Sequence, residues 1–173
     1  MTQTRTDGYA PIQIGLHWLM AAMVLFQLIF GESMAEATEA AEEGEALSDG
    51  DAILATAHYW VGVAILVLVA ARLLVRLRYG APAPLDSNPL MVAASKVTHG
   101  LFYLLLVIVP ISGLVAVHLN PEVGEIHELA KPAFILLILV HAGAALFHHF
   151  VLRDRTLVRM LAPTKARTDS PSA

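Results

Sequence analysis

The chain has 173 residues, of which 57% are hydrophobic and 15% are charged, and its formal net charge is −4. Soluble domains carry roughly 25% charged residues, so this composition excludes an ordinary soluble protein, and the negative net charge argues against nucleic acid as a partner. Cysteine is absent, which excludes iron–sulfur clusters held by thiolates and haem attached through a C-x-x-C-H motif.

Four long apolar runs follow one another along the chain. A helix of about 20 apolar residues spans the ~30 Å hydrocarbon core of a bilayer. The runs cover Ile12–Phe30, Ile53–Ala71 with a basic extension to Leu77, Val97–Leu119 and Pro132–Leu152. We therefore predict an all-α fold, an integral membrane four-helix bundle. Residues 1–163 would form this one domain, and residues 164–173, rich in serine, proline and threonine, would be a disordered cytoplasmic tail.

The first run is expected to stay in the protein as a membrane span. It is longer than the roughly 7–15 apolar residues of a signal peptide, and the flank before it carries Arg5 balanced by Asp7. The segment after it is acidic and has no basic residue: Glu32, Glu36, Glu39, Glu42, Glu43, Glu45, Asp49 and Asp51. Loops that lack lysine and arginine tend to cross the membrane, so this loop should face outward.

Basic residues follow the second and the fourth run. These residues are Arg72, Arg76, Arg78 and Lys96 after the second, and Arg153, Arg155, Arg159, Lys165 and Arg167 after the fourth. Short segments rich in lysine and arginine stay in the cytoplasm, so both termini are predicted to be cytoplasmic. Between the second and third runs, Tyr79–Pro84 is a connector punctuated by proline.

The fourth helix is expected to begin before its apolar run. Asn120 followed by Pro121 is a typical helix start, with an N-cap and then a proline at the first helical position, and Glu122 and Glu125 support it. Pro132 lies inside this helix and removes one backbone hydrogen bond. A kink near the membrane surface is therefore predicted.

Eight histidines in so apolar a chain need an explanation, because an ionisable side chain inside a bilayer costs several kcal/mol unless it is partnered. Their positions along the predicted spans define two depths. The outer layer consists of His58, His118 and His127, and the inner layer of His17, His99, His141, His148 and His149. Interhelical hydrogen bonding and binding of a metal cofactor are the two explanations of this pattern.

The spacing of the histidines suits two stacked haem groups. His127 and His141 are fourteen residues apart, which on a helix is about 21 Å along the axis and about 40° around it. Imidazoles on both sides of a haem iron close it to small ligands and favour electron transfer. Arg72 follows His58 by fourteen residues and so reaches the inner level, and either Arg72 or Arg76 could pair with a haem propionate.

Several motifs together resemble the bacterial cytochrome b561 family, small di-haem membrane proteins linked to quinone. The resemblance extends from Ile12 to Pro163 and rests on the order and spacing of the set rather than on any one motif. The motifs are Ile14-Gly15-Leu16-His17-Trp18-Leu19, Ala57-His58, Arg72-Leu73-Leu74-Val75-Arg76-Leu77, Leu101-Phe102-Tyr103-Leu104-Leu105, Pro110-Ile111-Ser112-Gly113, Ile126-His127-Glu128 and His141-Ala142-Gly143-Ala144-Ala145-Leu146-Phe147-His148-His149-Phe150.

The resemblance implies a set of cofactors and ligands. It assigns His17 and His141 to the iron of an inner haem b and His58 and His127 to the iron of an outer one, and it implies a location in the bacterial inner membrane. Arg72 is a further candidate haem contact because of its position on the second helix. It also implies an oxidoreductase that passes electrons from a periplasmic donor, superoxide in the best-known relatives, to membrane ubiquinone. Other relatives are cytochrome b subunits of periplasmic dehydrogenases or hydrogenases, and the resemblance does not choose between these roles.

Two observations bear on that choice. The acidic outer loop would repel an anionic donor such as superoxide and would suit a basic periplasmic electron-donor protein. A histidine-rich metal transporter is an alternative of another class. However, the spans contain no aspartate or glutamate and the chain shows no internal repeat, so a cation pathway would lack its usual carboxylates.

Overall fold

The computed structural model describes residues 8–85 and 88–163. All regular elements in these residues are helices: α1 (Pro11–Phe30), α2 (Glu32–Glu43), α3 (Asp49–Tyr79), α4 (Pro89–His118), α5 (Val123–Glu128), α6 (Ala130–Phe150) and α7 (Val158–Leu161). Four spans are long and apolar enough to cross a membrane, namely α1, α3, α4, and α5 together with α6. The prediction of an all-helical, four-span protein is confirmed, while the predicted tail, 164–173, lies outside the described residues.

The helices α3 and α4 extend beyond their apolar runs because polar residues cap them. The Ser48 side chain accepts a hydrogen bond from the backbone N–H of Asp51, so α3 begins four residues before its first large apolar residue, Ile53. This helix ends at Gly80, whose positive φ of 72° favours glycine. Asn88 caps α4 in the same way by accepting from the N–H of Leu90.

The acidic segment expected to be a loop is largely a helix, α2. Alanine and glutamate, which fill this segment, are strong helix formers, so local propensity explains the difference. The helix ends at Gly44, where φ is 71°. It packs on α3, and Lys131 at the start of α6 reaches Glu32 with a 3.1 Å contact between Nζ and Oε2.

The predicted interruption of the last span lies between α5 and α6, at Leu129. An N–H at position 132 would bond to the carbonyl of Glu128, and proline has none, so the chain breaks one turn before Pro132. The predicted helix start is also present in part. The side chain of Asn120 accepts from the N–H of Glu122 at 3.1 Å, and the α-helix itself begins at Val123.

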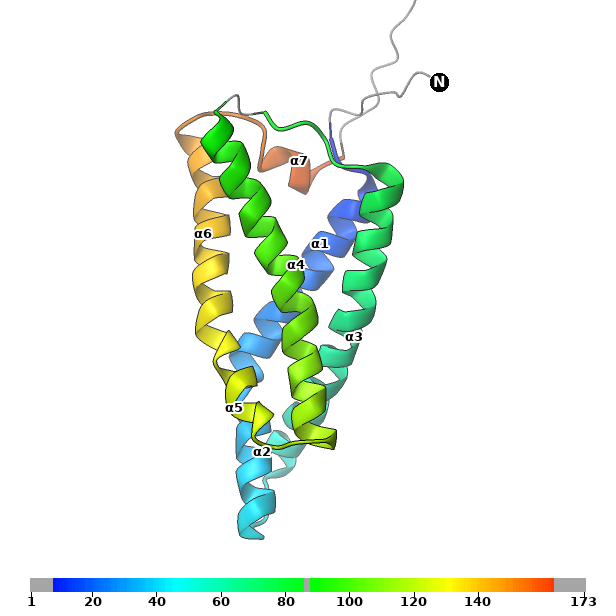
Figure 1. Ribbon diagram of the computed structural model, residues 1–173, viewed down its shortest axis with the longest axis vertical. Helices are drawn as coiled ribbons and strands as arrows, with labels where there is room; N and C mark the ends of the chain where they lie inside the picture. Colours follow the sequence, from blue (N-terminus) through cyan, green and yellow to red (C-terminus); the bar gives the residue numbers. More distant parts are fainter. Residues whose placement is uncertain (1–7, 86–87, 164–173) are drawn as a thin grey trace, which may run out of the picture.

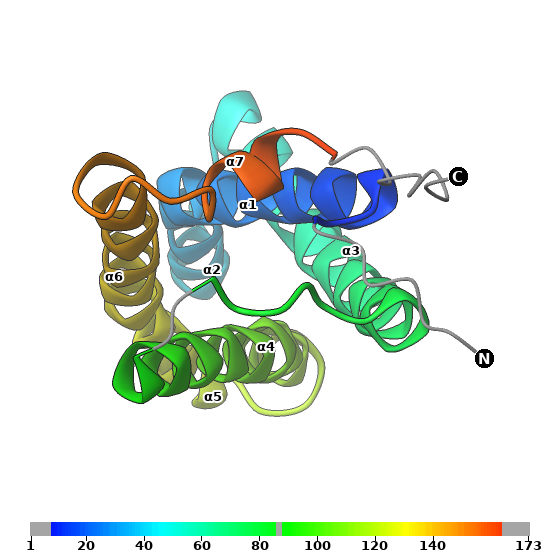
Figure 2. The same ribbon diagram turned by 90° about the horizontal axis from the view of Figure 1, so that it is seen from above.

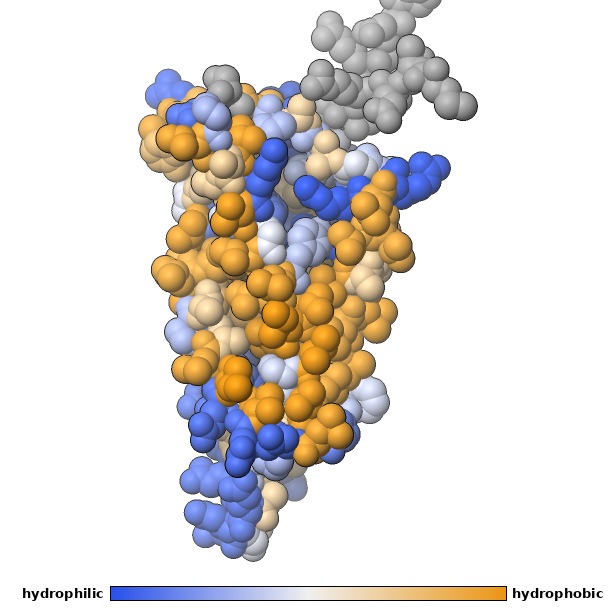
Figure 3. Space-filling view, viewed as in Figure 1, coloured by the Kyte–Doolittle hydropathy of each residue, from blue (hydrophilic) through white to orange (hydrophobic). Residues whose placement is uncertain are grey.

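The four spans form an elongated bundle (Figure 1). Helices α1, α2 and α4 pack on α3, and α6 packs on α4. At one end, called here the α7 end, α7 lies over the start of α1 (Figure 2), where Trp18 Nε1 donates to the carbonyl of Met160 at 2.8 Å. At the opposite end, the α2 end, α2 projects beyond the bundle (Figure 1). Figure 3 shows a broad hydrophobic belt between hydrophilic ends, the pattern of a protein that crosses a bilayer.

The buried core is a small apolar cluster in the middle of the bundle. Its members come from all four spans: Met20, Val24, Ile65, Val69, Leu106, Ala130 and Phe134. Most other large apolar side chains of the spans are exposed, such as Val67 at 66% and Leu136 at 65%, as expected for surfaces that face lipid. The cluster therefore links all four spans.

Candidate functional site

Four of the eight histidines form two facing pairs. In the pair toward the α2 end, His58 of α3 faces His127 of α5 with ring centroids 6.0 Å apart and ring planes at 76°. In the pair toward the α7 end, His17 of α1 faces His141 of α6 with centroids 6.2 Å apart and planes at 57°. These are the two pairings expected from the sequence, and each joins side chains from two different helices.

The separation within each pair fits two imidazoles on opposite sides of one iron. A histidine nitrogen binds a metal at roughly 2 Å, and the ring centre lies about 1.1 Å further out, so two such ligands in line place their centroids about 6 Å apart. Both measured separations, 6.0 and 6.2 Å, agree with this value. Direct hydrogen bonding between the rings would instead bring two ring nitrogens to about 3 Å, with the centroids correspondingly closer.

The chemistry of the donor set points to a macrocycle rather than a bare ion. Among residues 8–85 and 88–163, no group of three or more His, Cys, Asp or Glu side chains is arranged to hold a metal ion. Structural and catalytic zinc sites need three or four protein ligands, whereas a haem supplies four ring nitrogens and needs only the two axial positions. Paired histidines of this kind fit haem b, and they do not fit the metal-transporter alternative.

The ring of His127 is fixed by hydrogen bonds and close contacts with α4. Its Nδ1–H donates to the carbonyl of Val109 at 2.9 Å, with Ser112 Oγ 3.3 Å from the same nitrogen. A Cβ on Gly113 would lie 2.9 Å from His127 Cε1, so only glycine leaves room for the ring. Because Nδ1 carries the proton, Nε2 is the nitrogen left to bind a metal, the usual arrangement of a ligating histidine. Ser112 and Gly113 of the Pro110-Ile111-Ser112-Gly113 motif therefore help to position the His127 ring.

The opposite histidine, His58, lies beside a half-buried glutamine. Gln27 of α1 donates through Nε2 to the backbone carbonyl of His58 at 3.0 Å. The Gln27 Oε1 and the His58 Nδ1 are both buried and have no hydrogen-bond partner among the described residues. Gln27 was not among the predicted site residues, although an amide near the end of an apolar run is a signal that could have indicated it.

Arg72 reaches the α7-end pair, as its position in α3 predicted. Its Nη2 donates to Nδ1 of His17 at 3.0 Å, and the arginine is half-buried. His99 also lies at this level, with its ring centroid 5.3 Å from that of His141 and the planes at 89°. This separation is too short for the two rings to share an iron, so the geometry favours His17 over His99 as the partner of His141. The Nδ1–H of His99 donates to the carbonyl of Ser95 at 2.6 Å.

The remaining histidines lie toward the helix ends, as expected, and two of them have partners that the sequence did not indicate. Tyr59 donates its hydroxyl to His118 Nε2 at 3.0 Å, which links α3 to α4 at the α2 end. His148 Nδ1 donates to Asp154 Oδ2 at 2.5 Å and so joins the end of α6 to the segment that follows it. Partial burial alone would raise the pKa of Asp154, but hydrogen bonds from His148 and Thr156 hold it below its usual range.

Comparison with known proteins identifies the family. Residues 8–163 match the family model of prokaryotic cytochrome b561. The chain is 41% identical over 162 residues to cytochrome b562 of Cereibacter sphaeroides, covering 92% of this chain and 99% of that protein. It is 32% identical over 176 residues to a probable superoxide oxidase, CybB, of Yersinia pestis, covering 88% and 95% of the two chains. It is also 28% identical over 182 residues to cytochrome b561 homolog 1 of Escherichia coli, covering 92% and 99%.

The chain therefore belongs to the prokaryotic cytochrome b561 family. Membership of this family, together with the four apolar spans, makes the protein a multi-pass bacterial membrane protein that transfers electrons and uses haem b.

Proposed function

We propose that this member of the prokaryotic cytochrome b561 family holds two haem b groups and carries electrons between a donor at the α2 end and a quinone of the membrane. His58 and His127 would be the axial ligands nearer the α2 end, and His17 and His141 those nearer the α7 end. The observation that carries the proposal is the pair of ring separations, 6.0 and 6.2 Å, both of which suit two imidazoles on one iron.

When bound, each haem b allows its iron to alternate between ferric and ferrous states and so to carry one electron at a time. The histidine on each side of the iron would keep small ligands off it. Gly113 and Val109 fix the ring of His127, and Arg72 adds a positive charge beside His17. An arginine at this position would favour the reduced, less positive form of the cofactor and would make this haem accept electrons more readily from the other one.

The apolar cluster lies between the two proposed sites. In α3, Ile65 and Val69 come between His58 and Arg72, and in the last span Phe134 comes between His127 and His141. An apolar layer opposes the entry of charged groups, so a charged donor or acceptor would reach only the site on its own side. Electrons would therefore cross the layer while ions and water do not.

The distribution of charge predicts how the protein is oriented in the membrane, and the family resemblance supplies the direction of electron transfer. Arginines gather at the α7 end of α3, and the positive-inside rule puts that end in the cytoplasm and the α2 end in the periplasm of the inner membrane. The donor would then be periplasmic and the acceptor ubiquinone. Superoxide is one candidate donor, since a relative carries the name of a probable superoxide oxidase. The acidic helix α2 opposes the approach of an anion and favours a basic donor protein.

A second role has its own support. A chain that serves as the cytochrome b subunit of a periplasmic dehydrogenase or hydrogenase needs a docking surface at the periplasmic end, and α2 is a charged helix that extends beyond the bundle there (Figure 1). In that role the chain would co-purify with a larger periplasmic protein from its native membrane. An isolated chain that reduces ubiquinone with superoxide would favour the first role.

The test of the cofactor proposal is the amount of haem per chain. A pyridine haemochrome assay on the purified protein should give two b haems, and alanine at any one of His17, His58, His127 and His141 should lower this value toward one. His99→Ala is the matched control, because His99 lies at the level of the inner pair without the spacing of a ligand. The proposal fails if the wild-type protein contains no haem, or if His99→Ala loses haem while His17→Ala does not.

A further inference from the structure

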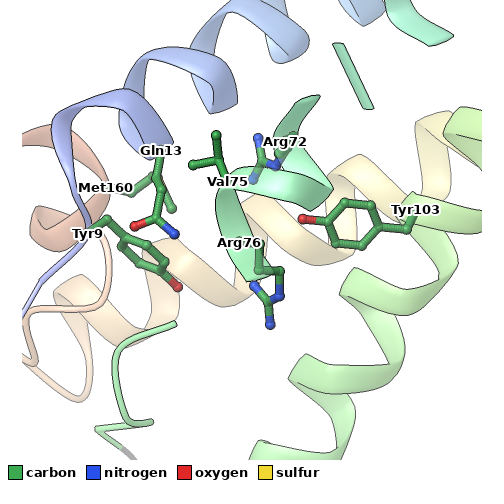
Figure 4. A pocket seen from close by; sticks show the side chains of 7 residues that line it. All are labelled: Tyr9, Gln13, Arg72, Val75, Arg76, Tyr103 and Met160. Carbon is green, nitrogen blue, oxygen red and sulfur yellow. The ribbon is translucent and has the colours of Figure 1, made fainter. Parts of the chain in front are cut away.

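A small pocket at the α7 end is lined by five side chains that can donate hydrogen bonds and by two apolar ones. It lies between the start of α1, the end of α3, α4 and α7, and Figure 4 shows its side chains. The residues that line it are Tyr9, Gln13, Arg72, Val75, Arg76, Tyr103 and Met160. No carboxylate is among these lining residues, so two guanidinium groups and two phenol groups face a common space without an anion to balance them.

The donors of this pocket are not used up by contacts within the protein. Gln13 is satisfied, because its Nε2 donates to the carbonyl of Gly80 at 2.9 Å and its Oε1 accepts from the N–H of Ala10 at 3.0 Å. In contrast, the structure gives Arg76, Tyr9 and Tyr103 no hydrogen-bond or ion-pair partner among the residues it describes. Arginine can only donate, so a ligand that satisfies this group has to be an acceptor and carry negative charge.

The room in the pocket limits the ligand to a small group. Its open volume is about 20 Å³, and a cavity needs roughly 10–15 Å³ to hold one water molecule. A carboxylate at the end of a flexible arm fits this space. The pocket can therefore take the charged terminus of a larger molecule that lies mostly elsewhere.

Arg72 connects the pocket to the proposed inner haem site. It lines the pocket and also donates to His17 Nδ1 at 3.0 Å. A histidine that binds iron through Nε2 carries its proton on Nδ1, and that N–H cannot accept from a guanidinium. Once His17 serves as a ligand, Arg72 therefore needs a different acceptor, and the pocket is the space that its guanidinium already faces.

We infer that this pocket, formed by Tyr9, Arg72, Arg76 and Tyr103, binds the propionate carboxylates of the haem held by His17 and His141. The inference rests on the proposed function, since it needs a haem at that pair, and it adds the residues that fix its orientation. Two guanidinium groups beside the propionates would keep these carboxylates ionised and raise the reduction potential of this haem relative to one without them. A phosphate of an anionic lipid has the same acceptor chemistry and is the competing source of the anion.

The test compares Arg76→Gln and Tyr103→Phe with two matched controls in the purified holoprotein. Arg78→Gln and Tyr79→Phe are the controls, because Arg78 lies over the ring of Tyr79, 5.8 Å from its centroid, and neither residue lines the pocket. A spectroelectrochemical titration should show a lower midpoint potential for one haem in Arg76→Gln and an unchanged potential for the other. Redox-difference infrared spectra of protein carrying haem with ¹³C-labelled propionates should show shifted carboxylate bands in both pocket variants and in neither control.

Three results would overturn the inference while leaving the proposed function intact. The first is two haems per chain with identical potentials and carboxylate bands in Arg76→Gln and the wild type. The second is the loss of a co-purifying anionic phospholipid from Arg76→Gln, seen by native mass spectrometry, with both haem potentials unchanged, since that result assigns the pocket to lipid phosphate. The third is a shift of the haem midpoint potential in Arg78→Gln equal to the shift in Arg76→Gln, which would indicate a general effect of surface charge. A wild-type protein without haem would instead refute the proposed function itself.

Discussion

The contact between Gly113 and His127 allows the sharpest test of ligand geometry. A Cβ placed on Gly113 would lie 2.9 Å from His127 Cε1 and 3.1 Å from Nδ1, whereas carbon atoms in normal contact are about 3.5–4.0 Å apart. The ring must therefore move by roughly 0.5 Å or more, which is about the tolerance of a functional site. The hydrogen bond from Nδ1 to Val109 opposes this movement. Overpacking of this kind costs about 1–3 kcal/mol, which corresponds to a ~5- to 150-fold weaker hold on the cofactor.

Gly113→Ala is expected to lose haem selectively from the α2-end site. The assay is the haemochrome stoichiometry of the purified variant, together with a redox titration that resolves the two haems. Gly100→Ala is the matched control in the same helix, because a Cβ there meets no atom within 4 Å. The control should keep both haems and be slightly more stable, since alanine favours a helix over glycine by about 1 kcal/mol. Full retention of both haems with unchanged spectra in Gly113→Ala would refute the reasoning.

Three further predictions concern other contacts of the site. Gln27→Leu removes the hydrogen bond to the backbone of His58 and should shift the potential of the α2-end haem alone, so an equal shift of both haems in a redox titration would contradict it. Asp154→Asn should lower stability in a thermal melt by about 0.5–1.5 kcal/mol. The folded-state pKa of Asp154 is lowered, so its contribution should be present above pH ~4 and fade as the pH falls further, and a wild-type advantage that persists below both pKa values would contradict this. Phe134→Ala should lower the free energy of unfolding by about 3–5 kcal/mol, which thermal melts followed by absorbance can check. Its absorption spectrum should show that both haems keep their ligands.

The features that depend on helix geometry could be predicted from the sequence. A fixed rise per residue puts His58 and Arg72 at two depths, and the structure has Arg72 beside His17 at the inner level. Pro132 lacks an N–H, and the break between α5 and α6 lies one turn before it. The four spans follow from hydropathy alone, because few soluble proteins need runs of that length.

Other features depend on tertiary contacts or local propensity that hydropathy does not report. The segment of α2 was read as a loop because it is polar, although its alanines and glutamates favour a helix. The pairing of His148 with Asp154 arises where the chain turns back after α6, and no periodicity predicts such a turn. The hydrogen bond from Arg72 to His17 Nδ1 joins α3 to α1, and helix periodicity alone does not predict which atom the guanidinium contacts.

The central claim is that each histidine pair binds one iron from both sides, and low-temperature electron paramagnetic resonance of the oxidised protein tests it most directly. Two distinct low-spin ferric haem signals are predicted, each integrating to one spin per chain. Single alanine variants at His58 and at His17 should each remove a different one of these two signals. A single low-spin signal in the wild type, or a predominant high-spin signal from iron with an open axial position, would contradict the account.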